Sequence, residues 1–143
     1  MSKRNIEEAY CRKNPENLLL IRANVERIFE IFGEKDIVDR IYINFCNPWP
    51  RGKHNKHRLT HTKQLENYKK FLKKGGEIYF KTDNDELFEA SIGYLKEAGF
   101  EIISTTYDLH SQPIFEKNIE TEHEKMFSED GIKIKALIAR NEI

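Results

Sequence analysis

Residues 40–63 hold the side chains best suited to chemistry, because a short apolar run leads there into a proline-rich turn and then into a basic stretch. Between Asp39 and Glu66 the sequence has six Lys or Arg residues and no acid, with three histidines among them. The whole chain has 24 basic and 24 acidic residues, so this is a local positive field. Such cations bind backbone phosphates, and Trp49 or a histidine beside them can stack on a base. The stretch favours a phosphate-contacting surface, with a solvated loop as the other interpretation.

The turn Asn47-Pro48-Trp49-Pro50 comes directly after the apolar run. The Asn47 side chain offers an amide oxygen and amide donors, which suit the edge of a planar base. The two prolines fix the path of the chain and hold Asn47 and Trp49 in place. An Asn before proline is also common in plain turns, so residue type alone leaves both interpretations open.

Three closely spaced histidines, His54, His57 and His61, suggest a metal site at first sight. Positive side chains are interleaved with them, however, and no Cys or acid completes a four-ligand set. We therefore expect no metal. The two cysteines, Cys11 and Cys46, are expected to be reduced thiols, and Cys46 to behave as a small buried hydrophobe.

Short β-rich runs alternate with amphipathic stretches, which predicts an α/β domain with a mostly parallel sheet. Strands are expected near residues 18–23, 40–45, 77–82, 101–107 and 132–139. Helices are expected at residues 6–12, 25–32, 60–74 and 85–98, where the apolar residues fit one buried face. Gly75-Gly76 and Gly99 follow two of these helices, where a left-handed residue closes the last turn. The alternation in the last strand suits an antiparallel strand that joins the sheet.

The composition predicts a single unit over residues 1–143, because there is no internal repeat, low-complexity segment or linker. The longest aliphatic run, residues 18–21, is far shorter than a membrane span, and no apolar region follows the basic start, so we expect a cytoplasmic protein. The seven glycines give no G-x-G in any frame, although α/β domains that bind nucleotide-type cofactors normally carry a glycine-rich turn. We therefore expect an N-terminally truncated domain whose exposed sheet edge favours association into homo-oligomers.

Three motifs, in this order, resemble signatures of the bacterial tRNA (guanine-N7-)-methyltransferase family. NFCNPWPRGKHNKHRL at residues 44–59 is similar to the family's N-F-x-D-P-W-P-K followed by a basic run. KTDNDELFEAS at residues 81–91 resembles its second signature, and NIETEHEKMF at residues 118–127 resembles its T-x-Y-E-x-x-F motif. Three motifs with fitting order and spacing are a much stronger signal than one.

The resemblance implies a Rossmann-like class I methyltransferase fold that lacks the family's N-terminal glycine-rich segment. It implies transfer of a methyl group from S-adenosylmethionine to N7 of a guanine in the tRNA variable loop. Asn47 falls at a catalytic or cofactor-contacting position, and Asn24 at a cofactor-binding one; the family has Asp at both. The positions that the resemblance assigns to substrate or RNA are Arg51, Lys53, His54, Asn55, Lys56, His57, Arg58, Asp83, Thr121, Glu122, His123 and Glu124. His123 stands where the family usually has Tyr.

The chemistry of this reaction tolerates the change from Asp to Asn, because guanine N7 carries a free lone pair and loses no proton on methylation. Alignment and stabilisation of charge on the purine matter more than a general base. We therefore expect Asn47 to weaken transition-state stabilisation without abolishing binding. A non-catalytic tRNA-binding module that has lost cofactor binding is the alternative from another class. Amino-methyltransferases with an N-P-P-[WFY] tetrad are a further relative, but the order here is N-P-W-P.

Overall fold

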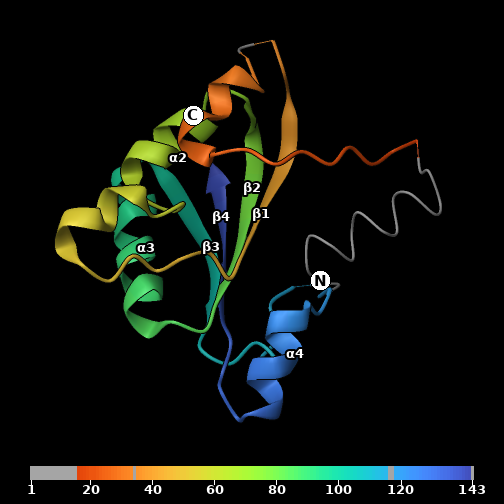
Figure 1. Cartoon of the computed structure of the whole chain (residues 1–143), viewed down its shortest axis with the longest axis vertical. Helices are drawn as coiled ribbons and strands as arrows, with labels where there is room; N and C mark the ends of the chain where they lie inside the picture. The colour runs from red at the N-terminus through yellow and green to blue at the C-terminus, as the bar shows by residue number, and fades with distance from the viewer. Residues whose placement is uncertain (1–15, 34, 116–117, 143) are drawn as a thin grey trace.

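The computed structural model describes residues 16–33, 35–115 and 118–142 and arranges them around one mixed sheet (Figure 1). The strands are β1 (Val38–Asn44), β2 (Leu72–Thr82), β3 (Phe100–Thr106) and β4 (Lys135–Asn141). The α-helices are α2 (Thr62–Tyr68), α3 (Asp85–Glu97) and α4 (Glu122–Glu129), and two 3-10 helices are η1 (Val25–Glu30) and η2 (Gly52–His57). The predicted α/β alternation is therefore confirmed from β1 onwards.

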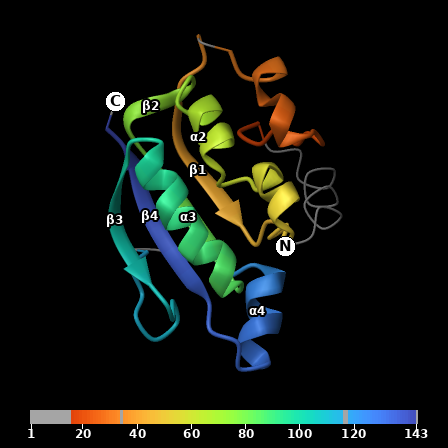
Figure 2. The same ribbon diagram turned by 90° about the vertical axis from the view of Figure 1, so that its left-hand side faces the viewer.

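The sheet has the strand order β1-β2-β4-β3. β1 is parallel to β2, and β4 is antiparallel to both β2 and β3, so β1, β2 and β3 all run in one direction. The predicted antiparallel C-terminal strand is confirmed, and it lies inside the sheet between β2 and β3 (Figure 2). The carboxyl ends of β1 and β2 meet at one edge, which is where open α/β sheets bind ligands.

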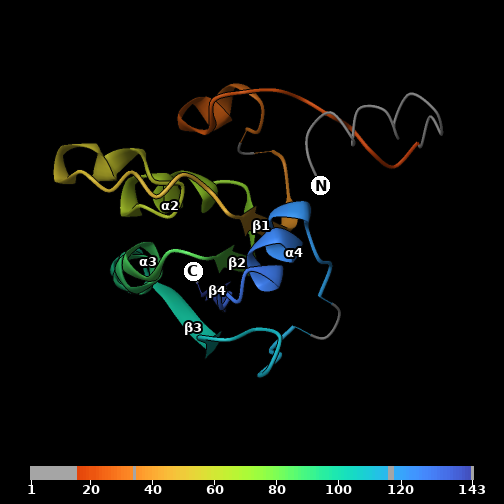
Figure 3. The same cartoon turned by 60° about the horizontal axis from the view of Figure 1, so that its bottom comes forward.

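The main core lies between the sheet and the two helices α2 and α3, which cover the same face (Figure 3). Its fully buried side chains include Leu65, Ile78, Phe80, Leu87, Phe88, Leu95 and Leu137. Burial of each side chain of this size stabilises the fold by about 1.5–3 kcal/mol. Helix α3 begins where the Asn84 side chain accepts a hydrogen bond from the Leu87 N–H at 2.8 Å, and it ends before Gly99, whose φ is 86°.

The parallel pair β1 and β2 contains an irregularity at its start. Val38 lies opposite Leu72, but Arg40 lies opposite Glu77, so β2 has extra residues there. Gly76 lies in this bulge, and a Cβ atom at that position would stand 2.7 Å from the Lys73 carbonyl oxygen. Gly76 therefore permits a close approach of backbone that no other residue allows.

Two predicted elements are wrong in the structure. No strand forms over residues 18–23, and Leu19 is 90% exposed, because no described strand pairs with this segment. The helix predicted at residues 60–74 ends at Tyr68, and Leu72 already begins β2. The last apolar residues of the predicted helix are buried as expected. They are buried where the chain enters β2 and pairs with β1, and not on a helix face. The segment 25–32 forms the 3-10 helix η1, and the helix predicted at residues 6–12 lies outside the described residues.

Strand β1 lies at the edge of the described sheet, and an apolar cavity of about 390 Å³ lies beside it. Residues 40–44 of β1 line one side of the cavity, and side chains from η1 and α2 line the other. Cys46 also lines it and packs against the core, and burial raises the pKa of its thiol to about 11. Cys46 thus behaves as the predicted small hydrophobe.

Candidate functional site

The three sequence motifs come together at the carboxyl ends of β1 and β2. Asn44 lies opposite Lys81 in the sheet, and the Phe45 N–H donates to the Lys81 carbonyl at 2.9 Å. The loop with Asn47 and the loop with Asp83 therefore begin side by side. Helix α4 joins them because the rings of His123 and Phe127 lie 6.3 and 5.8 Å from the Phe45 ring.

The turn after β1 has a strained backbone. Phe45 has a φ of 54° and Trp49 a φ of 42°, which are conformations that bulky residues rarely adopt. The Asn47 side-chain oxygen accepts a hydrogen bond from the Trp49 N–H at 3.0 Å and so folds the turn back on itself. Asn47 itself is exposed. Such strain persists only where surrounding contacts impose it, and it is common at functional sites.

The Trp49 ring is half-buried and packs against two histidines of η2. Its centroid lies 5.9 Å from the His54 ring and 5.2 Å from the His57 ring. In the orientation that satisfies its hydrogen bonds, the Asn55 side-chain nitrogen donates to the Trp49 carbonyl at 2.9 Å and the Arg51 carbonyl at 3.1 Å. These contacts make Pro48-Trp49-Pro50 and η2 one folded unit.

The predicted RNA-contacting residues divide into two groups. Arg51, Lys53 and Lys56 are exposed and present their charges to solvent, while His54, Asn55 and His57 are half-buried.

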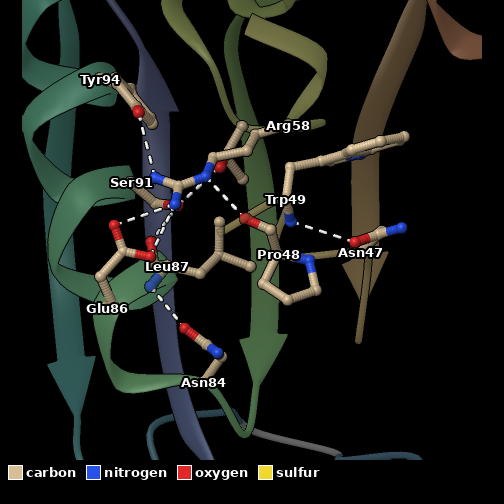
Figure 4. Close-up of polar contacts among 10 residues, drawn as sticks. Asn47, Pro48, Trp49, Arg58, Asn84, Glu86, Leu87, Ser91 and Tyr94 are labelled. Carbon is tan, nitrogen blue, oxygen red and sulfur yellow. Dashed lines mark hydrogen bonds and ion pairs between the residues drawn. The ribbon is translucent and has the colours of Figure 1, made fainter. Parts of the chain in front are cut away.

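Arg58 is 0% exposed, so the structure does not present this predicted RNA-contacting side chain at the surface. Its Nε donates to the Pro48 carbonyl at 2.7 Å, and its Nη2 donates to both oxygens of Glu86 at 2.9 and 2.6 Å (Figure 4). Its Nη1 donates to the Tyr94 hydroxyl at 3.2 Å. Burial alone would lower the pKa of Arg58, but the hydrogen bonds that it donates to Glu86 and Tyr94 raise it, so the guanidinium stays charged.

The 3-10 helix η1 reaches this unit through an ion pair between Glu26 and His57. The hydrogen bond from His57 lowers the pKa of the Glu26 carboxyl. Asn24, predicted to bind cofactor, caps η1, since its side-chain oxygen accepts from the Glu26 N–H at 3.0 Å. Asn24 and Asn47 thus lie on two segments, η1 and the turn leading into η2, which the Glu26–His57 pair connects.

Asp83 follows β2 and is half-buried at the same edge. Its backbone carbonyl accepts from Lys135 Nζ at 3.1 Å, and that ammonium also pairs with Asp85. Within the described part of the chain, no hydrogen bond or ion pair reaches the Asp83 carboxylate. Its oxygens are therefore available to a ligand at the site.

The segment Thr121–Glu124 begins α4, and its first and last residues have different roles and exposure. The Thr121 hydroxyl caps the helix by accepting from the Glu124 N–H at 3.2 Å. Glu122 and His123 are exposed. Glu124 is 0% exposed, so the structure does not present the predicted substrate-binding carboxylate at the surface.

The Glu124 carboxylate is the centre of a buried polar cluster. Lys81 Nζ donates to its Oε1 at 2.6 Å, and His110 Nε2 and the Asn118 amide contact its Oε2 at 2.6 and 2.8 Å. Burial would raise the pKa of Glu124, but the hydrogen bonds from Lys81, His110 and Asn118 outweigh it and hold the pKa below its usual value. Lys81 also donates to the Ile119 carbonyl at 2.9 Å and so ties the segment before α4 to β2.

Sequence analysis did not identify Lys81, His110 or Asn118 as parts of the site. Lys81 and Asn118 are the first residues of two of the quoted motifs, which is the signal that could have found them. His110 follows β3 outside every motif, so only the fold places it against Glu124.

The described side chains do not gather the three predicted histidines into one ligand set. His61 packs against Tyr94 instead, with ring centroids 4.8 Å apart. His110, Glu120 and Glu124 have ligand atoms within 4.8 Å of one another. The Lys81 ammonium bonded to Glu124 opposes a second cation there.

Solved structures of similar fold include a methyltransferase, a cyclase and an RNA-processing protein. The N-methyltransferase NodS from Bradyrhizobium japonicum matches with a TM-score of 0.57 and 14% identity, over 96% of this chain and 62% of that one. The [4+2]-cyclase SpnF matches with a TM-score of 0.61 and 12% identity, over 96% and 61%. The fibrillarin pre-rRNA processing protein from Methanococcus jannaschii has a TM-score of 0.54 and 20% identity, over 97% and 51%. The predicted Rossmann-like class I methyltransferase fold is confirmed.

Residues 2–137 match the family described as "Putative methyltransferase", so the chain belongs to this methyltransferase family. The tRNA (guanine-N(7)-)-methyltransferase of Clostridium beijerinckii is 62% identical over 141 residues, which are 97% of this chain and 64% of that protein. The protein of the same name from Clostridium botulinum strain Eklund 17B is 58% identical over 144 residues, or 99% and 65%. The chain thus spans less than two thirds of the length of these relatives.

Proposed function

We propose that this chain acts in tRNA (guanine-N7-)-methylation, in which a methyl group passes from S-adenosylmethionine to N7 of a variable-loop guanine. The names of the relatives support this proposal. The observation that carries it is the meeting of three separate motif segments at the carboxyl ends of β1 and β2, beside a turn that presents exposed cations. Among the described residues no helix is long and apolar enough to cross a membrane, and we propose a cytoplasmic location.

Binding of tRNA is the task that we assign to Arg51, Lys53 and Lys56. Their side chains are exposed on one turn and carry no acid between them. Cations of this kind bind phosphates with release of counterions, so each contact makes affinity fall with salt. Phosphate contacts of this kind do not depend on the tRNA sequence, and they would bring one guanine to the sheet edge.

Recognition of the guanine is the task of Asn47 and Asp83. The Asp83 carboxylate can accept from the N1–H and N2–H edge of the base and stabilise the positive charge that develops on the purine. Asn47 offers one more acceptor without charge. As N7 forms its bond to the methyl carbon, the bond from that carbon to sulfur breaks and no proton leaves, so these residues have to align and stabilise the base.

The described residues supply part of a site for S-adenosylmethionine, which provides the methyl group. The Asn24 oxygen caps η1 and the Asn47 oxygen accepts within the turn, and among the described residues nothing accepts from their amide nitrogens. These two donors suit a polar ligand at the sheet edge. The chain holds no G-x-G turn, and neither position has the carboxylate that would bind ribose hydroxyls. We therefore assign no step of the reaction to a cofactor contact.

The test compares two transcripts of one tRNA, the first with guanine and the second with 7-deazaguanine, which lacks N7. With radiolabelled S-adenosylmethionine, label should enter only the first transcript. Label in both would contradict N7 as the acceptor. Binding of tRNA without label in either would indicate the non-catalytic tRNA-binding module instead.

A matched pair of variants tests the assigned surface. Lys53→Ala with Lys56→Ala should weaken tRNA binding and reduce its salt slope by about 1.4–1.8 for two contacts. Lys73→Ala with Lys74→Ala removes the same charge at the opposite end of β2 and should leave the slope unchanged. Equal slopes for the two variants would contradict the assignment.

A further inference from the structure

Arg58 connects two loops that lie far apart in the sequence. Its Nε holds the carbonyl of Pro48, the residue between Asn47 and Trp49, at 2.7 Å. Its Nη2 holds both oxygens of Glu86 at the start of α3, and its Nη1 holds Tyr94 two turns further along. Figure 4 shows the guanidinium between the turn and the helix, with bonds to Pro48 on one side and to Glu86 and Tyr94 on the other.

The helix side of this connection is rigid. Leu87 and Leu95 of α3 are fully buried in the main core. The hydroxyls of Thr60 and Ser91 bond at 2.6 Å, and the Ser91 hydroxyl also contacts the Leu87 carbonyl at 2.7 Å. Thr60 lies two residues after Arg58, so the chain is fixed to α3 on that side as well. Arg58 therefore extends from a fixed support.

The turn side is the part that needs support. Trp49 has a positive φ, and the hydrogen bond from its N–H to the Asn47 side chain is exposed to solvent. A charged donor on the carbonyl between them stabilises one backbone conformation, because bonds to charged groups are stronger than neutral ones. Lys cannot replace this function, since one ammonium has no planar fork to span three acceptors.

We infer that Arg58 is a positioning residue that holds the Asn47–Trp49 turn in its strained conformation and couples it to α3. The two loops that follow β1 and β2 are thereby connected through one guanidinium, since Glu86 lies three residues after Asp83. The importance of Asn47 in this inference rests on the proposed function. The geometry of the turn does not, so it can be measured separately.

Trp49 is the one tryptophan of the chain and reports directly on this turn. Arg58→Lys should shift the Trp49 emission and raise its quenching by acrylamide under conditions where far-UV circular dichroism shows a folded protein. Arg140→Lys, a change of the same type on the partly exposed face of β4, should leave both unchanged. Unchanged emission and quenching in folded Arg58→Lys would overturn the inference, whatever the loss of thermal stability.

Weaker variants keep the test decisive if Arg58→Lys does not fold. Glu86→Gln removes the negative charge and one of its two acceptor oxygens, and Tyr94→Phe removes the hydroxyl acceptor, while both leave the bond to Pro48 possible; the double variant combines the two losses. Quenching of Trp49 should rise from wild type through the single variants to the double variant. The absence of such a series in folded proteins would contradict the coupling.

Binding of tRNA provides the second measurement. Loss of a fixed turn should weaken binding by about ten-fold in Arg58→Lys, which retains the charge. Altered fluorescence with unchanged tRNA affinity would support the positioning role and contradict the assignment of this turn to tRNA. Unchanged fluorescence with weakened affinity would overturn the positioning role and favour direct contact of Arg58 with RNA.

Discussion

Two buried cations, Lys81 and Arg58, lie at the same end of the sheet and are held by carboxylates in different ways. Lys81 is 4% exposed and its partner Glu124 is 0% exposed. Arg58 is 0% exposed, but its partner Glu86 is 62% exposed. Water therefore screens the second pair from one side and does not reach the first.

The difference predicts two kinds of consequence. When a pair is buried on both sides, removal of one partner leaves an uncompensated charge in a medium of low dielectric constant. When one partner faces water, removal of the buried partner leaves a charge that water solvates, and the loss falls on geometry more than on stability. We therefore expect Lys81 to determine the stability of the segment before α4, and Arg58 to determine the conformation of the turn.

The largest expected effect is that of Lys81→Met, which leaves Glu124 without its cation. The free energy of unfolding should fall by about 3–5 kcal/mol, measured by urea denaturation. Lys133→Met, at an exposed position, should change it by less than about 0.5 kcal/mol. A loss below about 1 kcal/mol for Lys81→Met would show that the two pairs do not differ as the burial indicates.

The pH dependence of stability sharpens the comparison. Because the folded-state pKa of Glu124 lies below its unfolded value of about 4.3, its ionised form stabilises the fold above that pH, and this contribution disappears as pH falls through the folded pKa. The groups that face it are Lys81 on β2, His110 after β3, and Asn118 and Glu120 before α4.

Glu124→Gln should therefore flatten the acid side of the stability profile and cost about 1–3 kcal/mol near pH 7. Urea midpoints measured from pH 7 to pH 3 provide the check. Glu129→Gln, on the exposed end of the same helix, is the control and should follow the wild-type profile. An unchanged acid slope in Glu124→Gln would contradict the assigned pKa direction.

An intermediate effect is expected at Asn47, on the turn that Arg58 holds. Asn47→Asp adds a charge that can stabilise the cationic purine and should raise the rate of methyl transfer to tRNA by about ten-fold. Asn67→Asp adds the same charge on α2, away from the turn, and should not change the rate. Equal rates for Asn47→Asp and wild type would show that charge at this position has no part in the transition state.

The smallest effect is expected for Glu86→Gln. The Glu86 carboxylate is largely exposed, and Arg58 keeps its bonds to Pro48 and Tyr94 and can still donate to the amide oxygen of the new side chain, so the free energy of unfolding should change by no more than about 1 kcal/mol, and less at high salt. Thermal denaturation at low and high salt measures both quantities. A loss of more than about 2 kcal/mol would place this pair in the same class as Lys81 and Glu124.

Much of the fold could be predicted from sequence because, from β1 onwards, the apolar periodicity and the residues that begin and end helices indicate the same elements. The helix over residues 85–98 is an example, since Asn84 and Gly99 bound a strong apolar face. The strand over residues 18–23 was wrong because an aliphatic run shows only that residues can be buried. The end of α2 was wrong because Phe71 and Leu72 fit a helix face and a strand equally well.

The site was predictable to the level of motifs but not of individual contacts. Arg58 belongs to a basic run, and its sequence neighbours do not distinguish a cation that binds phosphate from one that supports a turn. T-x-x-E at residues 121–124 is the pattern of a helix cap, and Thr121 acts as one. The direction of the Glu124 side chain depends on Lys81 and His110, which come from other elements.

The bulge at Gly76 sets the register between β1 and β2, and therefore which side chains of β2 face the site. Beyond the bulge, β1 and β2 pair residue by residue without a further irregularity, up to Asn44 and Lys81. Because side chains alternate between faces, an insertion of one position at the bulge would exchange Phe80 and Lys81 between the apolar core and the Glu124 cluster. A glycine, which has no functional group, thereby determines which face of the sheet presents Lys81, five residues further along β2.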